Sequence, residues 1–215
     1  MSGFDLQRGL MMLIPLVLSL TIHEYAHAWT AWRLGDDTAS RMGRLTLNPI
    51  AHIDPIGTLL LPLLNIPFGW ARPVPVNPTR FRPGVRMSTG MALTAAAGPA
   101  SNLLLAVLIT AGYALAVRFA PDLMARSGGV RQLLVVMIYL NVNLALFNLL
   151  PVPPLDGSRI VDGFMPLRLR PAWERVMMLS PFLLLAVFFL AGRIIAGPSS
   201  FVIGLLSRLA TALGA

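Results

Sequence analysis

The stretch Thr21-Ile22-His23-Glu24-Tyr25-Ala26-His27 reads H-E-x-x-H and lies inside a long apolar run. On an α-helix, His23 and His27 are one turn apart on the same face, so both imidazoles can reach a single Zn²⁺ ion. Glu24 points about 100° away from His23 around the helix axis, so it can lie beside the metal without binding it. That position suits a general base acting on a metal-activated water. The alternative is a pair of histidines that form hydrogen bonds between helices, with the spacing arising by chance.

The apolar surroundings of this motif favour the functional interpretation. Of the 215 residues, 56% are hydrophobic and 12% are charged, which is typical of membrane proteins. Ionisable side chains are costly in hydrocarbon, so an intramembrane cluster is a functional hypothesis by default. The run from Leu10 to Trp32 is long enough to span a bilayer, and Trp29 and Arg33 mark an interfacial end. His23 lies ten residues before Arg33, which places the metal roughly 15 Å from that interface.

The positive charge of the chain comes from arginine alone, with a net charge of +8 and no lysine. The arginines fall in short loops between apolar runs, where they indicate topology and lipid-headgroup contacts rather than nucleic-acid binding. Most of them would share a side with Arg33, which predicts a site nearer the cytoplasmic face. There are no cysteines, which excludes a thiolate metal site and a disulfide framework. The N-terminal run lacks a small-residue cleavage site, so we expect no cleavable signal peptide.

Further apolar runs predict further helices. They cover residues 87–117, 132–155 and 176–192, and a weaker element at 194–209, after Arg193, leaves its crossing open. Residues 55–71 are too short and too interrupted by proline to span, and predict a re-entrant or interfacial segment. Residues 41–48 alternate near Leu45 and Leu47, which predicts a short strand. We therefore expect an all-α polytopic membrane protein, a bundle of about five to six hydrophobic helices with a short membrane-associated β or re-entrant segment after the first helix.

Three further polar residues are candidates for the site. Asp156 follows a proline-broken helix, where an isolated aspartate is usually a cap or a loop charge. However, the zinc site lacks a third protein ligand, and no other carboxylate lies in such a membrane-edge position, so we predict that Asp156 completes it and leaves an open position for water. Asn102 lies in a long apolar helix, where packing between helices and a role in the site are both open. His52 is a neighbour of the metal, a substrate-gate residue or an interfacial histidine, the last being the commonest case.

Three motifs follow one another in the chain: HEYAH at 23–27, AGPASN at 97–102 and NLLPVPPLDG at 148–157. Together they resemble the site-2 proteases, which are intramembrane zinc metalloproteases, and segments 47–57 and 70–77 resemble a compact bacterial and archaeal branch. The resemblance implies one zinc ion per chain held by His23, His27 and Asp156, with Glu24 as the base. It also implies that Asn102 and Asn148 support the site or hold substrate. No PDZ insertion or C-terminal CBS module is evident, which leaves substrate selection and regulation open.

The expected protein is a single membrane-embedded metalloprotease domain over 1–215, with a core at 10–163 and C-terminal helices at 176–214. It would hydrolyse peptide bonds in or near transmembrane segments of membrane proteins, as in regulated intramembrane proteolysis, in a prokaryotic cell membrane. Segments 44–48 and 73–78, including Leu45 and Leu47, could pair with an extended substrate. The alternatives are a zinc transporter, which would carry further ligand clusters, and a zinc-binding scaffold, which would tolerate loss of Glu24. The sequence leaves the oligomeric state open.

Overall fold

The computed structural model describes residues 6–64 and 69–214, and these ranges form helices, turns and loops without a strand. The main helices are α1 (Leu6–Arg33), α4 (Met87–Phe119), α6 (Gly128–Asn148), α7 (Asp156–Phe164) and α9 (Ser180–Ala212). Shorter elements connect them: α2 (Thr38–Arg41), η1 (Pro49–Ala51), η2 (Pro55–Leu60), α3 (Leu61–Leu63), η3 (Pro78–Arg80), α5 (Pro121–Arg126), η4 (Leu167–Leu169) and α8 (Arg170–Met178). The all-helical expectation is confirmed for the described residues.

Among the described residues, three helices, α4, α6 and α9, are long and apolar enough to cross a membrane. α1 is also long, at 28 residues, but its polar motif interrupts the apolar run, and its crossing stays a prediction. At its expected interfacial end, the guanidinium of Arg33 lies 5.5 Å from the centre of the Trp29 ring. This cation–π contact is of the kind that amphipathic side chains make at membrane surfaces.

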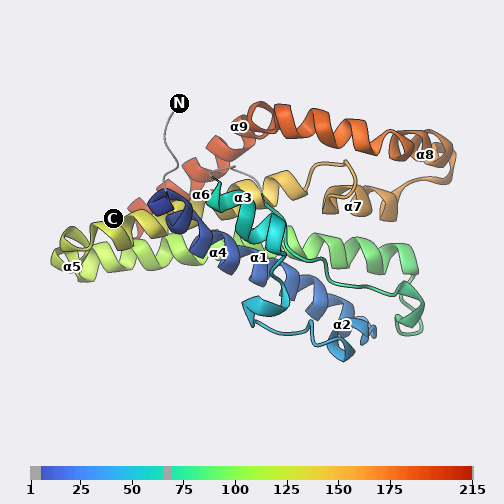
Figure 1. Ribbon diagram of the computed structural model, residues 1–215, viewed down its shortest axis with the longest axis horizontal. Coiled ribbons are helices and arrows are strands. Elements are labelled where there is room, and N and C mark those ends of the chain that lie inside the picture. Colours follow the sequence, from blue (N-terminus) through green and yellow to red (C-terminus); the bar gives the residue numbers. More distant parts are fainter. Residues whose placement is uncertain (1–5, 65–68, 215) are drawn as a thin grey trace.

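The C-terminal region differs from the expectation of two elements separated at Arg193. α9 continues through Arg193 as one helix of 33 residues, with Pro198 inside it, and it bends along its length in Figure 1. A single arginine does not end a helix, because arginine is a good helix former and its long side chain can carry the charge away from an apolar surface. The bend has a cause in Pro198, which removes one backbone hydrogen bond. The predicted break at Arg193 is wrong.

The short strand expected over residues 41–48 is also wrong. These residues form the end of α2, followed by turns and a loop. A short alternating run gains little as a strand unless a partner completes its hydrogen bonds. Here local bonds satisfy the backbone instead, since Arg44 N donates to Ala39 O at 2.8 Å and Asn48 caps η1 through Ile50 N at 3.1 Å. Residues 55–71 form η2 and α3 against α1, with 65–68 outside the described residues. Their re-entrant path stays a prediction.

The bundle is built around α4, which packs against α1, α6, α7 and α9 (Figure 1). Small residues allow these close approaches. A Cβ atom added to Gly163 of α7 would lie 2.5 Å from Ala92 Cβ and 2.7 Å from Ser88 O of α4. The predicted 132–155 helix ends as α6 at Asn148, and the prolines that follow allow the chain to turn back into α7. This return places the start of α7 beside α1.

Candidate active site

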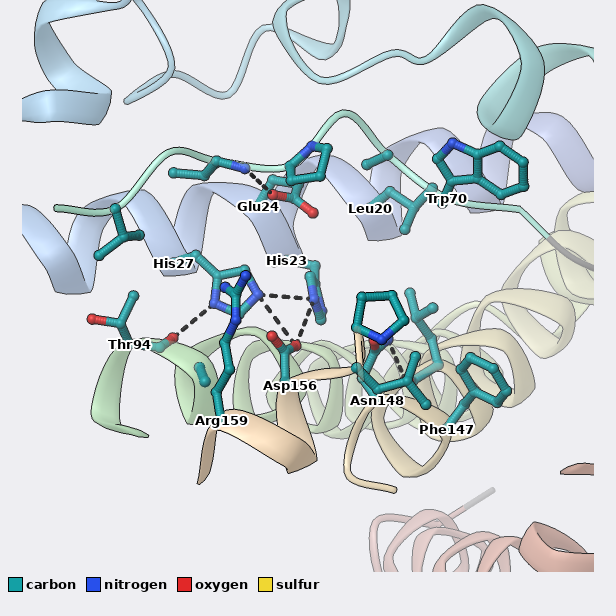
Figure 2. Close-up of a pocket in the computed structure, with 18 of the residues that line it drawn as sticks. Leu20, His23, Glu24, His27, Trp70, Thr94, Phe147, Asn148, Asp156 and Arg159 are labelled. Carbon is teal, nitrogen blue, oxygen red and sulfur yellow. Dashed lines mark hydrogen bonds and ion pairs between the residues drawn. The ribbon is translucent and has the colours of Figure 1, made fainter. Parts of the chain in front are cut away.

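Three side chains converge between α1 and the first turn of α7, as Figure 2 shows. The Nε2 atoms of His23 and His27 are 3.0 Å apart. Asp156 Oδ2 lies 3.2 Å from Nε2 of His23 and 3.3 Å from Nε2 of His27. Ligand atoms about 2.0 to 2.2 Å from a tetrahedral zinc ion lie about 3.3 to 3.6 Å from one another. The three atoms therefore have nearly the spacing of three corners of such a tetrahedron, and together they could hold a metal ion.

The other ring nitrogens of both histidines are already bound. His23 Nδ1 lies 2.6 Å from Asn102 Oδ1, and His27 Nδ1 lies 2.7 Å from the backbone oxygen of Thr94. Because both partners only accept, each Nδ1 donates, and a neutral ring then has a lone pair on Nε2. Asp156 Oδ2 is buried without a hydrogen-bond donor among the described residues. Two lone pairs and a carboxylate oxygen facing one another are stabilised by a cation between them, so these residues fit a metal ion.

Two glycines allow the three ligand atoms to meet. A Cβ atom on Gly98 of α4 would lie 2.5 Å from His27 Cε1 and 2.6 Å from His23 Cε1. A Cβ atom on Gly157 would collide with the backbone carbonyl of Leu149. Gly98 thus lets α4 pass directly beneath both imidazoles. Gly157 lets α7 start against the last turn of α6, which turns Asp156 toward α1.

Glu24 points from α1 toward the extended segment formed by residues 69–77 (Figure 2). Its carboxylate is buried, with 8% of the residue exposed, and Oε2 accepts a hydrogen bond of 3.0 Å from Val74 N. Glu24 is not one of the three converging side chains, yet it lines the same cavity of about 480 Å³. A volume of this size is typical of ligand sites. The cavity therefore contains a candidate metal site and an adjacent carboxylate.

The extended segment forms one wall of the cavity and is held by hydrogen bonds to its backbone. Thr58 Oγ1 donates to Trp70 O at 2.7 Å, and Arg72 N donates to His52 O at 2.8 Å. The buried guanidinium of Arg44 donates to the carbonyls of Arg72 and of Pro73, the latter at 3.1 Å. The proline-rich sequence keeps this segment out of a helix, and these bonds fix its position relative to α1.

Residues near the end of α1 hold the far end of the extended segment. Asp36 is completely buried, and its Oδ2 accepts from Asn77 N at 2.6 Å. Beside it, Asp37 forms ion pairs with Arg41 at 2.7 Å and Arg80 at 2.8 Å. Desolvation raises the pKa of Asp37, but the hydrogen bonds from Arg41 and Arg80 outweigh it, so the pKa lies below its usual value. These polar contacts fix the end of the extended segment next to the cavity.

The structure places the remaining candidate residues at different distances from the site. Asn102 lies directly behind His23, and Asn148 lines the cavity while its Nδ2 donates to Leu144 O at 2.9 Å. Leu45, Leu47 and His52 are not among the described residues that line the cavity. Leu45 packs against the buried cluster of Ala28, Ala39 and Val74, Leu47 is 58% exposed, and His52 is buried with Nε2 2.8 Å from Thr46 O.

Sequence reasoning missed several contributors to this site. Gly98 lies under both imidazoles, a position that the sequence motif does not specify. Thr94 and Val74 act through backbone groups, which no side-chain pattern reveals. Arg44 is buried and binds the wall of the cavity, which its place in an arginine-rich loop does not indicate. The glycine of the AGPASN motif, Gly98, is the one sequence feature that could have indicated such a close approach of two helices.

Comparison with known proteins gives the family. Residues 117–191, which include Asp156 and follow the H-E-x-x-H motif, match the model of "Peptidase family M50". The chain is 48% identical over 159 residues to "Putative zinc metalloprotease YwhC" of Bacillus subtilis, covering 72% of this chain and 69% of that protein. It is 34% identical over 161 residues to "Putative zinc metalloprotease Rip2" of Mycolicibacterium smegmatis, covering 75% of this chain and 58% of that protein.

The Rip2 protein of Mycobacterium tuberculosis is 33% identical over 167 residues, which is 78% of this chain and 60% of that protein. The chain thus spans less than two thirds of the Rip2 proteins.

No solved structure matches the chain. The relationship to YwhC extends over more than two thirds of both proteins, and three helices are long and apolar enough to cross a membrane. The chain is an integral membrane protein that belongs to peptidase family M50, the site-2 protease family.

Proposed function

We propose that this protein is a zinc metalloprotease that cleaves peptide bonds in or near transmembrane segments, as in regulated intramembrane proteolysis. The observation that carries the proposal is the convergence of two imidazole Nε2 atoms and one carboxylate oxygen within 3.0–3.3 Å of one another. Glu24 lies in the same cavity. The names of the relatives as zinc metalloproteases support zinc as the ion.

In this proposal His23, His27 and Asp156, which line the cavity, would hold one zinc ion. A catalytic zinc ion supplies Lewis-acid polarisation of the scissile carbonyl and makes water a nucleophile near neutral pH. Glu24 accepts the proton of the attacking water and delivers it to the leaving amine. The hydrogen bond from Val74 N keeps the Glu24 carboxylate directed into the cavity for both transfers.

The substrate binds as an extended chain, because a helix hides its carbonyls in internal hydrogen bonds. The extended segment 69–77 supports this view, since it lines the cavity and its backbone is held straight by neighbouring groups. Extended peptides commonly pair with the backbone of an extended segment. Leu45 supports this wall through the cluster that contains Val74, and the exposed Leu47 offers an apolar side chain to a substrate. Asn148 holds substrate within the cavity, and His52 stabilises the wall through its bond to Arg72.

The proposed setting is a prokaryotic cell membrane, with the site nearer the cytoplasmic face. The arginine-rich loops after α1 and around α7 and α8 support this orientation. The whole of 1–215 acts as one domain, with transmembrane proteins as substrates. A zinc transporter is the weaker alternative, because the described residues contain one cluster of three ligating side chains rather than a series along a path.

A direct test compares wild type, Glu24→Gln and Glu174→Gln on a panel of single-span membrane substrates. Bound zinc is quantified in each purified protein. Glu174 lies exposed on α8 and is a matched control for the loss of one carboxylate. Glu24→Gln should keep zinc and lose cleavage by at least about 100-fold, and Glu174→Gln should match wild type. Equal cleavage by wild type and Glu24→Gln would refute the mechanism. Zinc binding without cleavage in all three would favour a scaffold.

A further inference from the structure

Buried hydrogen bonds connect the backbone of α6 to the metal-facing ring of His23. Ser19 of α1, Asn102 of α4 and Asn141 of α6 take part, and each is 0% exposed. The sequence assigns no role to Ser19 or Asn141. Buried amides in a membrane bundle are stable only when their donors and acceptors have partners. The partners therefore decide which end of each amide faces its neighbour.

Two backbone oxygens set the direction of these bonds: Ser19 O accepts from Asn102 Nδ2 at 3.4 Å, and Met137 O accepts from Asn141 Nδ2. Met137 O can only accept, and it lies 2.8 Å from Asn141 Nδ2, which also donates to Ser19 Oγ at 2.9 Å. Asn141 must then direct its Oδ1 toward Asn102, and Asn102 Nδ2 donates to that oxygen at 2.7 Å. Asn102 is left with Oδ1 facing His23, at 2.6 Å from Nδ1. Because Oδ1 only accepts, His23 Nδ1 carries the proton.

We propose that Asn141 is a positioning residue that fixes, through Asn102, the His23 tautomer able to bind the metal. With the proton on Nδ1, the lone pair of a neutral ring lies on Nε2, which faces His27 and Asp156. If the Asn102 amide turned over, its nitrogen would face Nδ1, and the proton would be displaced to Nε2. Asn141 opposes that turn most strongly, because the Oδ1 atoms of the two asparagines would then face each other across the 2.7 Å contact, whereas the bond that Asn102 Nδ2 would lose to Ser19 O is longer, at 3.4 Å. The identity of the ion as zinc rests on the proposed function.

His27 provides an internal contrast. Its Nδ1 donates to the backbone oxygen of Thr94 at 2.7 Å. A helix carbonyl cannot turn over, so the tautomer of His27 needs no side-chain partner to maintain it. The proposal therefore predicts an asymmetric result: loss of the Asn141 amide changes His23 and leaves His27 unchanged. A general loosening of the bundle would affect both.

The test uses ¹⁵N-histidine labelling of the metal-free protein in detergent, since the chain contains three histidines. Protonated and unprotonated ring nitrogens have well-separated ¹⁵N resonances, which report each tautomer. In Asn141→Leu the His23 signals should move toward an Nε2-protonated ring, while those of His27 and His52 stay. Asn143→Leu, on the same helix and only half-buried, is the matched control and should change nothing. An unchanged His23 tautomer in folded Asn141→Leu would overturn the proposal.

The second readout is zinc affinity, measured by competition with a chelator. Partners of metal-bound histidines typically contribute 10- to 100-fold in affinity, and Asn141→Leu should lose about that much while Asn143→Leu loses none. Asn141→Asp keeps an oxygen facing Asn102, so it should keep the tautomer and most of the affinity. This variant decides the question if the leucine variant does not fold. A folded Asn141→Asp protein with the other His23 tautomer would count against the proposal.

These readouts require no substrate, so they separate this inference from the proposed proteolysis. If the tautomer and affinity respond as described but no peptide is cleaved, the proposed function fails and the role of Asn141 stands. If the wild type is active, Asn141→Leu should recover kcat in saturating zinc with KM unchanged, because the bound ion itself selects the required tautomer. A kcat defect that persists in saturating zinc would instead indicate a structural role and contradict the proposal.

Discussion

A Cβ atom on Gly98 would lie 2.5 Å from Nε2 of His27, closer than real Cβ contacts come. Gly98→Ala should therefore displace one or both imidazoles and weaken zinc binding by at least about tenfold, at a cost of about 1 to 3 kcal/mol for the overpacked contact. Gly112→Ala on the same helix is the control, because a Cβ atom there meets nothing within 4 Å. Chelator competition and thermal unfolding of both variants test this. Equal zinc affinity in Gly98→Ala and wild type would contradict the geometry of the site.

Metal removal should destabilise the protein, because the three ligand atoms then face one another without a cation. At a zinc concentration 100 times the dissociation constant, the ion should add about 2.7 kcal/mol to the stability of the folded state. Asp156→Asn should lose most of this stabilisation, and Asp162→Asn, on the exposed face of α7, should keep it. Unfolding temperatures with and without zinc measure the difference. A zinc-dependent shift of the same size in Asp156→Asn would exclude Asp156 as a ligand.

Arg44 should matter for substrate binding more than for the metal. Arg44→Met removes the donors to the Arg72 and Pro73 carbonyls, and hydrogen bonds from charged groups contribute about 1.5 to 3 kcal/mol. We expect KM to rise by about tenfold or more, with bound zinc unchanged, because the cavity wall is loosened. Arg41→Gln is the matched control, since its ion pair with Asp37 is exposed and contributes about 0 to 1 kcal/mol. Kinetics together with zinc content would show the contrast. If Arg44→Met lost its bound zinc, Arg44 would support the metal site rather than substrate binding alone, and the prediction would fail.

Leu45 and Leu47 should differ in importance. Leu45 packs against the buried cluster of Ala28, Ala39 and Val74, whereas Leu47 is 58% exposed. Leu45→Ala should cost about 2 kcal/mol in stability and lower cleavage, and Leu47→Ala should stay within about 0.5 kcal/mol of wild type. Unfolding free energies and cleavage rates report both effects. If Leu47→Ala were the more damaging change, direct contact with substrate would explain it better than support of the wall.

The sequence determined the chemistry and the helical class of this protein. H-E-x-x-H on a helix places His23 and His27 on one face whatever surrounds them, because the helical repeat is local. The prolines after Asn148 likewise decide locally that α6 ends there. Local rules wrongly predicted a strand over residues 41–48 and a helix break at Arg193. A strand requires a partner, and a lone charge does not end a helix.

The tertiary structure decided how distant parts of the chain complete the site. It brought Asp156 to the two histidines, placed Gly98 beneath them and joined Val74 to Glu24. It also connected Asn141 to His23 through Asn102. These relationships depend on which helices pack side by side and on backbone atoms that carry no residue-specific signal. Such contacts are set by the fit of whole helices, so no spacing within one segment could have revealed them.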